Sequence, residues 1–352
     1  MDLATTCSSI PDSDEGAARA ARVRWDSIAK PLHGLGLLED AVARIAALRG
    51  TPEVELGKRA VVVMCADNGV VAEGVTQTGQ EVTAIVAGNI TCGDASVCHM
   101  ARIARADVFS VNMGMVDTAE VSYDFSIAPQ TGNIAEGPAM SRGQAGQAIA
   151  AGLAIADDLA AQGYGIIATG EMGIGNTTTA SAIISVLLGL PVEEVTGRGA
   201  GLSDEGLERK VAAIGRAIAV NHPDPDDALD VLAKLGGFDI AGMVGLFIGG
   251  AIHRIPVLID GFISACAALV VARLCPRASQ AMFATHLSGE PATRLVLGAL
   301  GLEPLVCAGM HLGEGTGAVA ALPLLDMALS VYNGMVSFED ISIEAYTPQG
   351  GA

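Results

Sequence analysis

Apolar residues along the chain follow two spacings, one typical of helices and one typical of short buried strands. Helical spacing covers 17–27 and 37–48, on either side of a KPLHGLG break. Further along, short runs rich in β-branched residues lead into turns that contain glycine. These runs begin the segments at 59–70, 106–115, 163–190, 255–274 and 280–290. Because strands alternate with helical spacing, the pattern predicts an α/β fold with a mostly parallel, doubly wound sheet.

The end of the chain predicts a second, smaller structural unit. The last apolar segment has helical spacing with Pro323 near its start, and we expect it to pack against the N-terminal helices. This divides the chain into N-terminal helices at 1–50, an α/β core at 51–315, and a C-terminal helix and tail at 316–352. The two terminal segments are expected to form a small helical lobe beside the core.

The charge of the chain argues against two classes of partner. Its 352 residues include 39 acidic and 20 basic side chains, for a formal net charge of −19. Nucleic acids and anionic membrane surfaces are bound through basic patches, so neither is expected as a partner. The N-terminus lacks the basic and apolar regions of a signal peptide, and the longest uncharged apolar runs are shorter than a membrane span. We therefore expect a cytoplasmic protein without membrane insertion.

Cysteine and histidine spacing predicts neither disulfides nor a metal site. The seven cysteines are scattered, odd in number and without CxxC spacing. We interpret them as small apolar side chains of a protein from a reducing compartment. No HExxH sequence or paired-aspartate metal motif is present, so no catalytic metal is expected.

The stretch ATGEMGIGNTTTAS, at 168–181, has the composition of an anion-binding loop. It lies between a predicted strand and a predicted helix, so its backbone N–H groups and threonine hydroxyls would meet the positive end of a helix dipole. The residues expected to contact an anion are Gly173, Gly175, Asn176, Thr177 and Thr178. The loop matches neither GxxxxGK[ST] nor GxGxxG, which removes the usual support for ATP or NAD. The simpler alternative is a glycine-rich helix cap that binds nothing.

A second glycine-rich loop, GRGAG, precedes another predicted helix. Gly197 and Gly199 would let an anion approach the backbone closely. Ser203 and Gly206 have the pattern of a helix start, which places Lys210 about two turns along that helix, where its ammonium could meet a phosphate. The alternative for Lys210 is a solvent-exposed lysine on a helix face.

Glu314 lies between two glycines, directly before a helix that is almost wholly apolar. Partial burial there would raise the pKa of its carboxyl group and make it a better general base near neutral pH. Alternatively, it is an acid that complements the dipole at a helix N-terminus. Other polar residues stand at expected strand ends, and several are interpreted as turn formers or Asx caps. They are Asp67, Asn68, Asp239, Asp260, His286, Ser288 and Glu290.

Taken together, these motifs resemble the nicotinate-nucleotide–dimethylbenzimidazole phosphoribosyltransferase (CobT) family. Matching motifs run along almost the whole chain, and GEMGIGNTT and LGEGTGA are highly specific to that family. The others are KPLHGLGLLEDAVARIA, ADNGVVAEGVT, TGRGAGLSDEGLERK, GGFDIAGM, IPVLIDGFISACAAL and HLSGEPA. The resemblance implies a Rossmann-like three-layer α/β fold with a small helical lobe, and a homodimer. It also implies that 5-phosphoribosyl moves from nicotinate mononucleotide to a benzimidazole nitrogen, with inversion to an α-glycosidic bond.

The family's functional positions fall on particular residues of this chain. Glu314 matches the general base, Glu171 a second functional glutamate, and Lys210 a functional lysine. The glycines of the two loops, together with Ser288, match the contacts to phosphate and ribose. Further substrate-binding positions match Asp67, Asn68, Thr76 and Ile85.

Three positions depart from the family pattern. Asn68 replaces a histidine, His311 replaces an arginine, and Ile85 replaces a glutamine that the family places in the base pocket. A pocket without that polar side chain should discriminate less by hydrogen bonding. The acceptor is therefore left open between dimethylbenzimidazole, another benzimidazole, a purine and a phenol.

The chemistry that the resemblance implies needs no cofactor or metal. Nicotinate leaves through a cationic pyridinium nitrogen, and nearby carboxylates would stabilise the ribosyl charge that develops. We assign that role, or substrate positioning, to Glu171, and removal of the acceptor's N–H proton to Glu314. One alternative is a non-catalytic nucleotide-binding subunit of an active paralogue, which would be free to lose its base. A dinucleotide-dependent oxidoreductase is a further alternative, but it lacks its fingerprint here.

Overall fold

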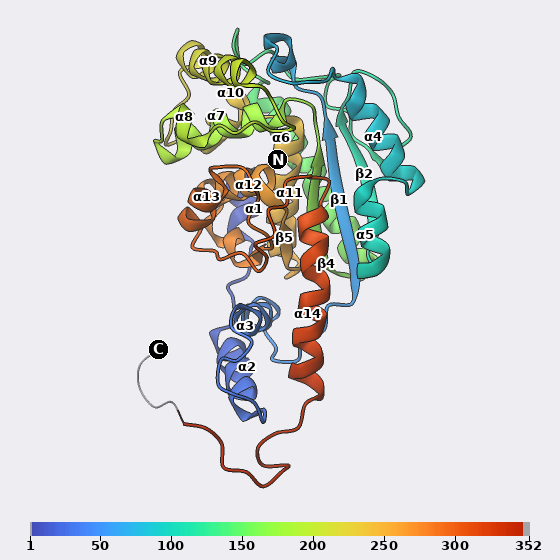
Figure 1. Ribbon diagram of the computed structural model, residues 1–352, viewed down its shortest axis with the longest axis vertical. Helices are drawn as coiled ribbons and strands as arrows, with labels where there is room; N and C mark the ends of the chain where they lie inside the picture. Colours follow the sequence, from blue (N-terminus) through green and yellow to red (C-terminus); the bar gives the residue numbers. More distant parts are fainter. Residues whose placement is uncertain (1, 348–352) are drawn as a thin grey trace.

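The computed structural model describes residues 2–347, and its centre is a six-stranded sheet in the order β3-β2-β1-β4-β5-β6. All five strand pairings are parallel. The strands are β1 (Lys58–Ala66), β2 (Asp107–Gly114), β3 (Tyr123–Asp124), β4 (Tyr164–Met172), β5 (Val257–Ile259) and β6 (Met282–Ala284). Figure 1 shows α4 and α5 on one side of the sheet and α11 and α12 on the other. The predicted α/β fold with a parallel sheet is confirmed.

The helices in the described part of the chain agree with the predicted segments and add several more. The helices expected at 17–27 and 37–48 are α2 and α3, and each of the five expected strands is present. The sequence analysis did not assign α4, α5, α6 or α11. In chain order the helices are α1 (Leu3–Ser8), α2 (Glu15–Ser27), α3 (Leu37–Arg49), the 3-10 helix η1 (Gly69–Glu73), α4 (Glu81–Cys92), α5 (Ser96–Ala104), α6 (Arg142–Ala161), α7 (Asn176–Leu188), α8 (Val192–Val195), α9 (Asp204–Asn221), α10 (Ala228–Leu235), α11 (Phe238–Ile252), α12 (Gly261–Leu274), η2 (Pro276–Ala281), α13 (Thr293–Ala299) and α14 (Thr316–Gly334).

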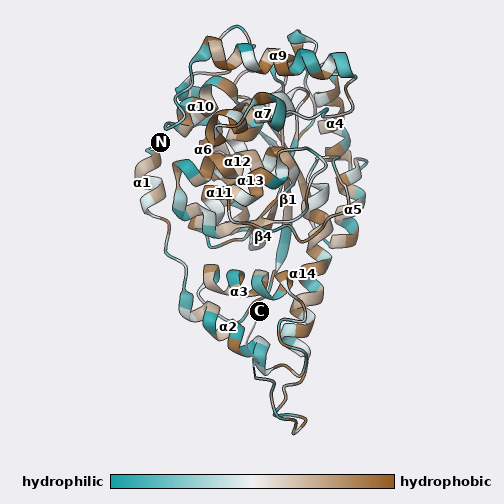
Figure 2. Cartoon of the chain, turned by 60° about the vertical axis from the view of Figure 1, so that its left-hand side comes forward, coloured by the Kyte–Doolittle hydropathy of each residue, from teal (hydrophilic) through white to brown (hydrophobic). Residues whose placement is uncertain are grey.

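Helices α6 and α11 cross at very short range because both carry glycine where they touch. A Cβ atom on Gly152 would lie 1.9 Å from the carbonyl oxygen of Gly242, and one on Gly245 would lie 2.1 Å from that of Ile149. Helix α11 is buried along nearly its whole length, because it also contacts β1 and α12. Figure 2 shows α11 and α12 as mostly hydrophobic. Among the described residues, no helix is both long enough and apolar enough to span a membrane.

Helix α14 connects the sheet to the packed N-terminal helices α2 and α3. Arg59 of β1 donates to both carboxylate oxygens of Asp326, near the middle of α14. Further along, the rings of Trp25 and Tyr332 pack with their centroids 4.9 Å apart, and Arg24 Nε donates to the Tyr332 carbonyl at 2.9 Å. Figure 1 shows the same helix running from the sheet to α2 and α3. The domain boundaries at 50 and 315 remain predictions, and the last five residues of the predicted tail lie outside the described chain.

The prediction that no cysteines form disulfides is wrong for one pair. Cys7 and Cys275 form a disulfide, with their Cα atoms 5.5 Å apart. The two residues are 268 positions apart in the sequence, so spacing along the chain could not reveal their contact. The interpretation as apolar core side chains also fails for Cys92 and Cys307, which are exposed.

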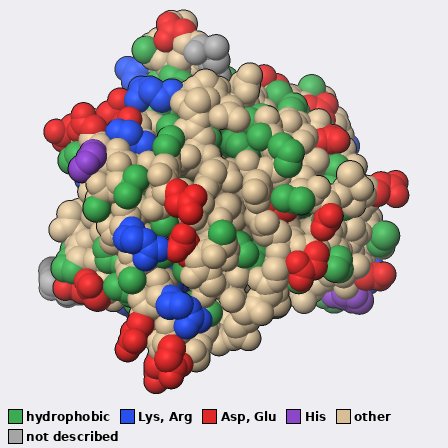
Figure 3. Space-filling view, turned by 90° about the horizontal axis from the view of Figure 1, so that it is seen from above, with side chains coloured by type: hydrophobic (Ala, Val, Ile, Leu, Met, Phe, Trp, Pro, Cys, Tyr) green, Lys and Arg blue, Asp and Glu red, His purple; other side chains and the backbone are tan. Residues whose placement is uncertain are grey.

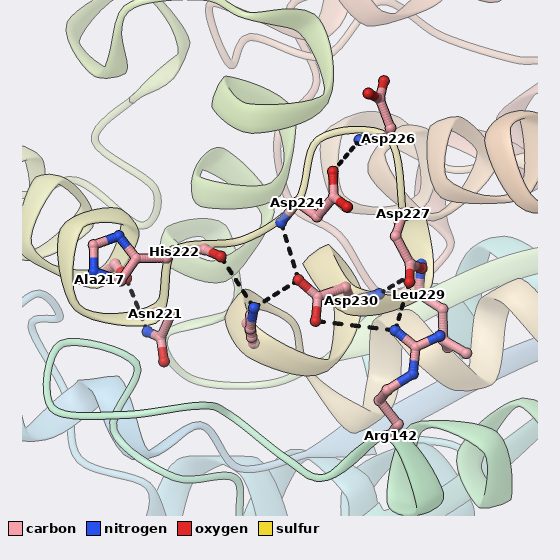
Figure 4. Close-up of polar contacts among 10 residues, drawn as sticks. Arg142, Ala217, Asn221, His222, Asp224, Asp226, Asp227, Leu229 and Asp230 are labelled. Carbon is pink, nitrogen blue, oxygen red and sulfur yellow. Dashed lines mark hydrogen bonds and ion pairs between the residues drawn. The ribbon is translucent and has the colours of Figure 1, made fainter.

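The turn between α9 and α10 is held together by aspartates that accept backbone hydrogen bonds (Figure 4). Asp227 caps α10 by accepting from the N–H groups of Leu229 and Asp230, at 3.1 and 3.0 Å. Its other oxygen accepts from Arg142 at 2.7 Å, and Asp230 accepts from the N–H of Asp224 at 3.0 Å. This acidic segment therefore has a structural role at the surface.

Replacing Gly152 by alanine should destabilise the protein, because the new methyl group would collide with the backbone of α11. Overpacking of this kind costs about 1–3 kcal/mol. Gly146 lies in the same helix and has no atom within 4 Å of an added Cβ, so G146A is the matched control. G146A should leave the free energy of unfolding in urea unchanged or raise it by up to about 1 kcal/mol. Equal effects of the two substitutions would contradict the account of this helix crossing.

Candidate active site

A cavity of about 300 Å³ lies where the carboxyl ends of the parallel strands meet. Its lining comes from loops that directly follow β4, β5 and β6, together with the loop before α9 and the loop before α14. Ligands in open parallel sheets bind at this edge. Figure 3 views the molecule from above, with acidic side chains scattered over the face and its margin and Lys and Arg side chains mainly on the left. On this face of the described residues the basic side chains do not form a continuous surface.

Glu171, at the end of β4, belongs to a buried network of carboxylates. The Asn176 side-chain amide donates to Glu171 Oε2 and, at 2.9 Å, to Asp239 Oδ2. Burial, reinforced by neighbouring carboxylates, raises the pKa of Glu171 to about 8, although the hydrogen bond from Asn176 opposes this. Burial likewise raises the pKa of Asp239 to about 6. The expectation that Asp239 stands at a strand end is wrong, because it lies in the first turn of α11.

Glu314 is held in an unusual backbone conformation at the start of α14. Gly313, Glu314 and Gly315 all have positive φ, at 88°, 61° and 92°. Two glycines tolerate this region easily, whereas a glutamate there carries a conformational cost. The Glu314 carboxylate accepts from the N–H of Val97 at 3.4 Å, at the N-terminus of α5. Burial raises the pKa of Glu314, and this hydrogen bond partly opposes the shift. The negative charge of Glu314 is thus favourable beside the positive N-terminal end of α5, and the side chain is also partly desolvated.

Asp260 fixes the loop that carries Glu314. Its side chain is buried and accepts from the N–H groups of Gly315, Gly317 and Ala318 at 2.9, 2.8 and 3.0 Å. Asp260 therefore caps α14. From the sequence, several polar residues at strand ends were instead expected to cap the turns in which they lie. Burial raises the pKa of Asp260, and His286 opposes that shift from 3.9 Å away.

Lys210 lies behind the cavity wall, next to the lining residue Thr177, and is completely buried. Its ammonium donates to Thr177 Oγ1 at 2.8 Å and to the Gly197 carbonyl at 3.0 Å. Burial lowers the pKa of Lys210 to about 8, against an opposing effect of Glu290. The alternative of a solvent-exposed lysine is therefore excluded. The lysine instead joins the two glycine-rich loops, because Thr177 lies in the first turn of α7 and Gly197 precedes α9.

Most of the residues expected in the site line the cavity. They are Glu171, Gly173, Gly175, Asn176, Thr177, Gly199, Ser288, Thr76 and Glu314. Lys210 and Gly197 lie directly behind this surface, because the hydrogen bonds of the lysine join Gly197 to the lining residue Thr177.

Besides Lys210 and Gly197, four expected residues do not line the cavity. Asp67 accepts from the N–H of Val116 at 2.8 Å and supports a turn, and Thr178 is completely buried. Asn68 is buried and donates to the Ile174 carbonyl, behind the glycine loop. Ile85 is 58% exposed on α4, and its neighbour Val86 lines the cavity, because successive residues of a helix face different directions.

Several lining residues were missed or set aside in the sequence analysis. Asp260, His286 and Glu290 were noted only among polar residues at expected strand ends, and His311 only as a departure from the family pattern. Arg198 was not considered separately, although it stands inside the GRGAG loop. In the sequence, the one signal that could have placed Glu290 in the site is its position two residues after Ser288 in HLSGE.

Comparisons with known proteins assign the chain to a family. The sequence model described as phosphoribosyltransferase matches residues 10–343. The chain belongs to this phosphoribosyltransferase family. The nicotinate-nucleotide–dimethylbenzimidazole phosphoribosyltransferase of Acetivibrio thermocellus is 46% identical over 328 residues, 93% of each chain. That of Desulforudis audaxviator is 46% identical over 344 residues, 97% of this chain and 98% of the relative. The crystal structure of CobT from Thermus thermophilus superposes with a TM-score of 0.89 at 40% identity, covering 94% of this chain and 99% of that one. The resemblance inferred from the motifs is confirmed.

Replacing Asp260 by asparagine should destabilise this phosphoribosyltransferase. One oxygen of Asp260 accepts two N–H groups and the other accepts one, so an asparagine would present an NH₂ group to one of these donors. We expect D260N to lower the free energy of unfolding by about 2 kcal/mol.

Asp227 offers a matched control for D260N, because it caps α10 in the same way from the surface. Asparagine is an equally good N-cap, so D227N should change the urea-unfolding free energy by less than about 1 kcal/mol. Wild-type stability of D260N would contradict the role given to Asp260.

Proposed function

We propose that this chain transfers the 5-phosphoribosyl group of nicotinate mononucleotide to 5,6-dimethylbenzimidazole. The products would be nicotinate and α-ribazole 5′-phosphate, which serves in assembly of the cobamide nucleotide loop. The observation that carries the proposal is one cavity in which Glu171 and Glu314, both with raised pKa, lie beside an anion-binding loop. The names of the relatives support this choice of substrates.

The phosphate of the nucleotide would bind between the two glycine-rich loops. Helix α7 begins at Asn176, so the positive end of its dipole faces the cavity. The Lys210 ammonium uses two of its three N–H groups for Thr177 and Gly197. The ammonium lies behind the cavity wall, so its charge would act on the phosphate through Thr177, which lines the cavity. This arrangement supports recognition of one phosphate without a metal ion.

The ribosyl group would then lie beside Glu171. In the transfer, the bond between C1′ and the pyridinium nitrogen breaks, and its electron pair stays on that nitrogen, which leaves as neutral pyridine nitrogen. Positive charge develops on C1′ and the ring oxygen, and an ionised carboxylate nearby stabilises it. A cationic ring bound next to Glu171 favours the ionised form of a group whose pKa is otherwise about 8.

Glu314 would act as the general base for the acceptor. The unprotonated nitrogen of benzimidazole attacks C1′, and the proton on the other ring nitrogen must leave to give the neutral product. The raised pKa of Glu314 suits it to accept that proton near neutral pH. Its position is set by Asp260, through the N–H groups of Gly315 and Gly317.

The rest of the cavity suits a flat apolar base. Val75, Val86, Met172, Phe262 and Leu312 all line it. These side chains would pack against the methylated ring of dimethylbenzimidazole. They offer few hydrogen bonds to a purine, which supports a benzimidazole as the acceptor.

We also propose that the chain works as a homodimer. Met327 of α14 is 62% exposed, and Met335 and Val336 directly after the helix are 42% and 48% exposed. Neighbouring apolar side chains at a surface favour contact with another protein surface. A second copy of the chain is the partner that the family resemblance implies.

The activity is tested by mixing the protein with nicotinate mononucleotide and a panel of benzimidazoles, adenine and phenols, without added metal. Chromatography and mass spectrometry should detect nicotinate and a phosphoribosylated benzimidazole. The Glu314→Gln variant should form this product at least about 100-fold more slowly, because it lacks the base.

Three results of this assay would contradict the proposal in whole or in part. Transfer to no base, despite nucleotide binding, would favour the non-catalytic partner subunit. Equal rates for the wild type and Glu314→Gln would show that another group removes the proton. Transfer to adenine or a phenol alone would keep the reaction and replace the acceptor.

Nucleotide binding at about pH 9 should take up close to one proton, because the pKa of Lys210 is lowered to about 8. At that pH most of the side chain is neutral, and a phosphate dianion beside it would restore the ammonium. The contribution of Lys210 to affinity should therefore fall as the pH rises through 8. Calorimetric titration of nicotinate mononucleotide in two buffers with different ionisation enthalpies measures the uptake. The Lys210→Gln variant should show none; an uptake equal to that of the wild type would contradict the assignment.

A further inference from the structure

The carboxylate of Glu290 occupies hydrogen-bond donors of the GRGAG loop. Its Oε1 accepts from the N–H of Gly199 at 3.0 Å. The same carboxylate packs flat against Gly197, where an added Cβ would lie 1.9 Å from Oε2. Glu290 reaches this loop from the segment after β6, two residues beyond Ser288. It therefore connects two loops that both line the cavity.

This contact is not explained by stability. Glu290 Oε2 is buried and accepts no hydrogen bond from any described residue. A buried carboxylate oxygen without a partner costs about 1–3 kcal/mol or more. The Gly199 N–H would form an equally good hydrogen bond with water or with another anion. The arrangement places a negative charge, at an energetic cost, against a loop that favours anions.

The surroundings of Glu290 are those of a phosphate site. The carbonyl of Gly197 accepts from the Lys210 ammonium, which also binds Thr177 at the start of α7. The proximity of Glu290 favours the charged form of Lys210. The carboxylate thus acts on the same cation and the same N–H donor that a phosphate would use.

We propose that Glu290 lowers the affinity of the site for phosphate groups by competing with the nucleotide phosphate for the Gly199 N–H. The proposal rests on the proposed function, because it takes the bound anion to be the phosphate of the nucleotide. A phosphate must displace the carboxylate from Gly199, and the nearby negative charge weakens anion binding. Free orthophosphate, which lacks other contacts, is thereby excluded, whereas a nucleotide gains enough from its ribose and base to displace the carboxylate. The same competition speeds release of the phosphorylated product.

The test measures the affinity of the full-length protein for orthophosphate, nicotinate mononucleotide and nicotinate riboside by calorimetry. Glu290→Gln keeps the shape of the side chain and removes its charge, and Glu290→Ala removes the carboxylate. Both variants should bind orthophosphate and the mononucleotide about tenfold more tightly than the wild type, since removing a like charge is worth about 1.4 kcal/mol. Their affinity for the riboside, which has no phosphate, should not change.

Glu303→Gln is the matched control, because Glu303 lies on the same segment between β6 and α14 but lines a different cavity. It should bind all three ligands as the wild type does. Weaker binding of the mononucleotide and the riboside by both Glu290 variants would overturn the proposal and make Glu290 a ribose ligand. Unchanged affinity for orthophosphate would overturn it as well.

The outcome can be separated from the fate of the proposed function. Transfer to dimethylbenzimidazole by the wild type is measured in the same samples. Tighter orthophosphate binding in the variants without any transfer product from the wild type would contradict the proposed function alone. Transfer by the wild type without any change in orthophosphate affinity would contradict only the role of Glu290.

Discussion

The capping of α14 by Asp260 is the contact on which the site depends. It joins the end of β5 to the loop of Glu314 through three backbone hydrogen bonds. The contact also requires Gly317, because a Cβ atom there would lie 1.8 Å from His286 Nδ1. The far end of α14 packs on α2 and α3 through Tyr332. One helix thus relates the position of the proposed base to both the sheet and the N-terminal helices.

The site is built at a cost to stability. Glu171, Asp239, Asp260 and Glu314 all have pKa values raised by burial, so each would be more stable in water as an anion than it is here. Asn176 relieves part of this cost by donating to two of them. A substrate with a cationic ring and a developing ribosyl charge supplies the positive charge that the cluster lacks. Under the proposed function, this cluster would stabilise the positive charge that develops on the ribosyl group in the transition state.

The parts of the fold and site that the sequence predicted are those set by local pattern. β-Branched runs followed by glycine turns predicted the strands, and helix-start signals placed Lys210 two turns into α9. What failed depended on contacts between distant segments. The side chain of Asp260 caps a helix that begins at residue 316, and the Cys7–Cys275 disulfide joins opposite ends of the chain. Ile85 matched the family position in the base pocket. Which side of α4 faces the cavity depends on how the helix packs, and in the structure Val86 lines it.

The central claim is that Glu314 takes the acceptor's proton while Glu171 serves the ribosyl group, and an acceptor without that proton tests it most directly. In 1,5,6-trimethylbenzimidazole the N–H is replaced by N–CH₃, so attack on C1′ gives a cationic product and needs no base. The rates of Glu314→Ala and Glu171→Gln are measured relative to the wild type with this acceptor and with dimethylbenzimidazole. The account predicts that Glu314→Ala is slow only with dimethylbenzimidazole and that Glu171→Gln is slow with both. An equal loss in Glu314→Ala with both acceptors would contradict it.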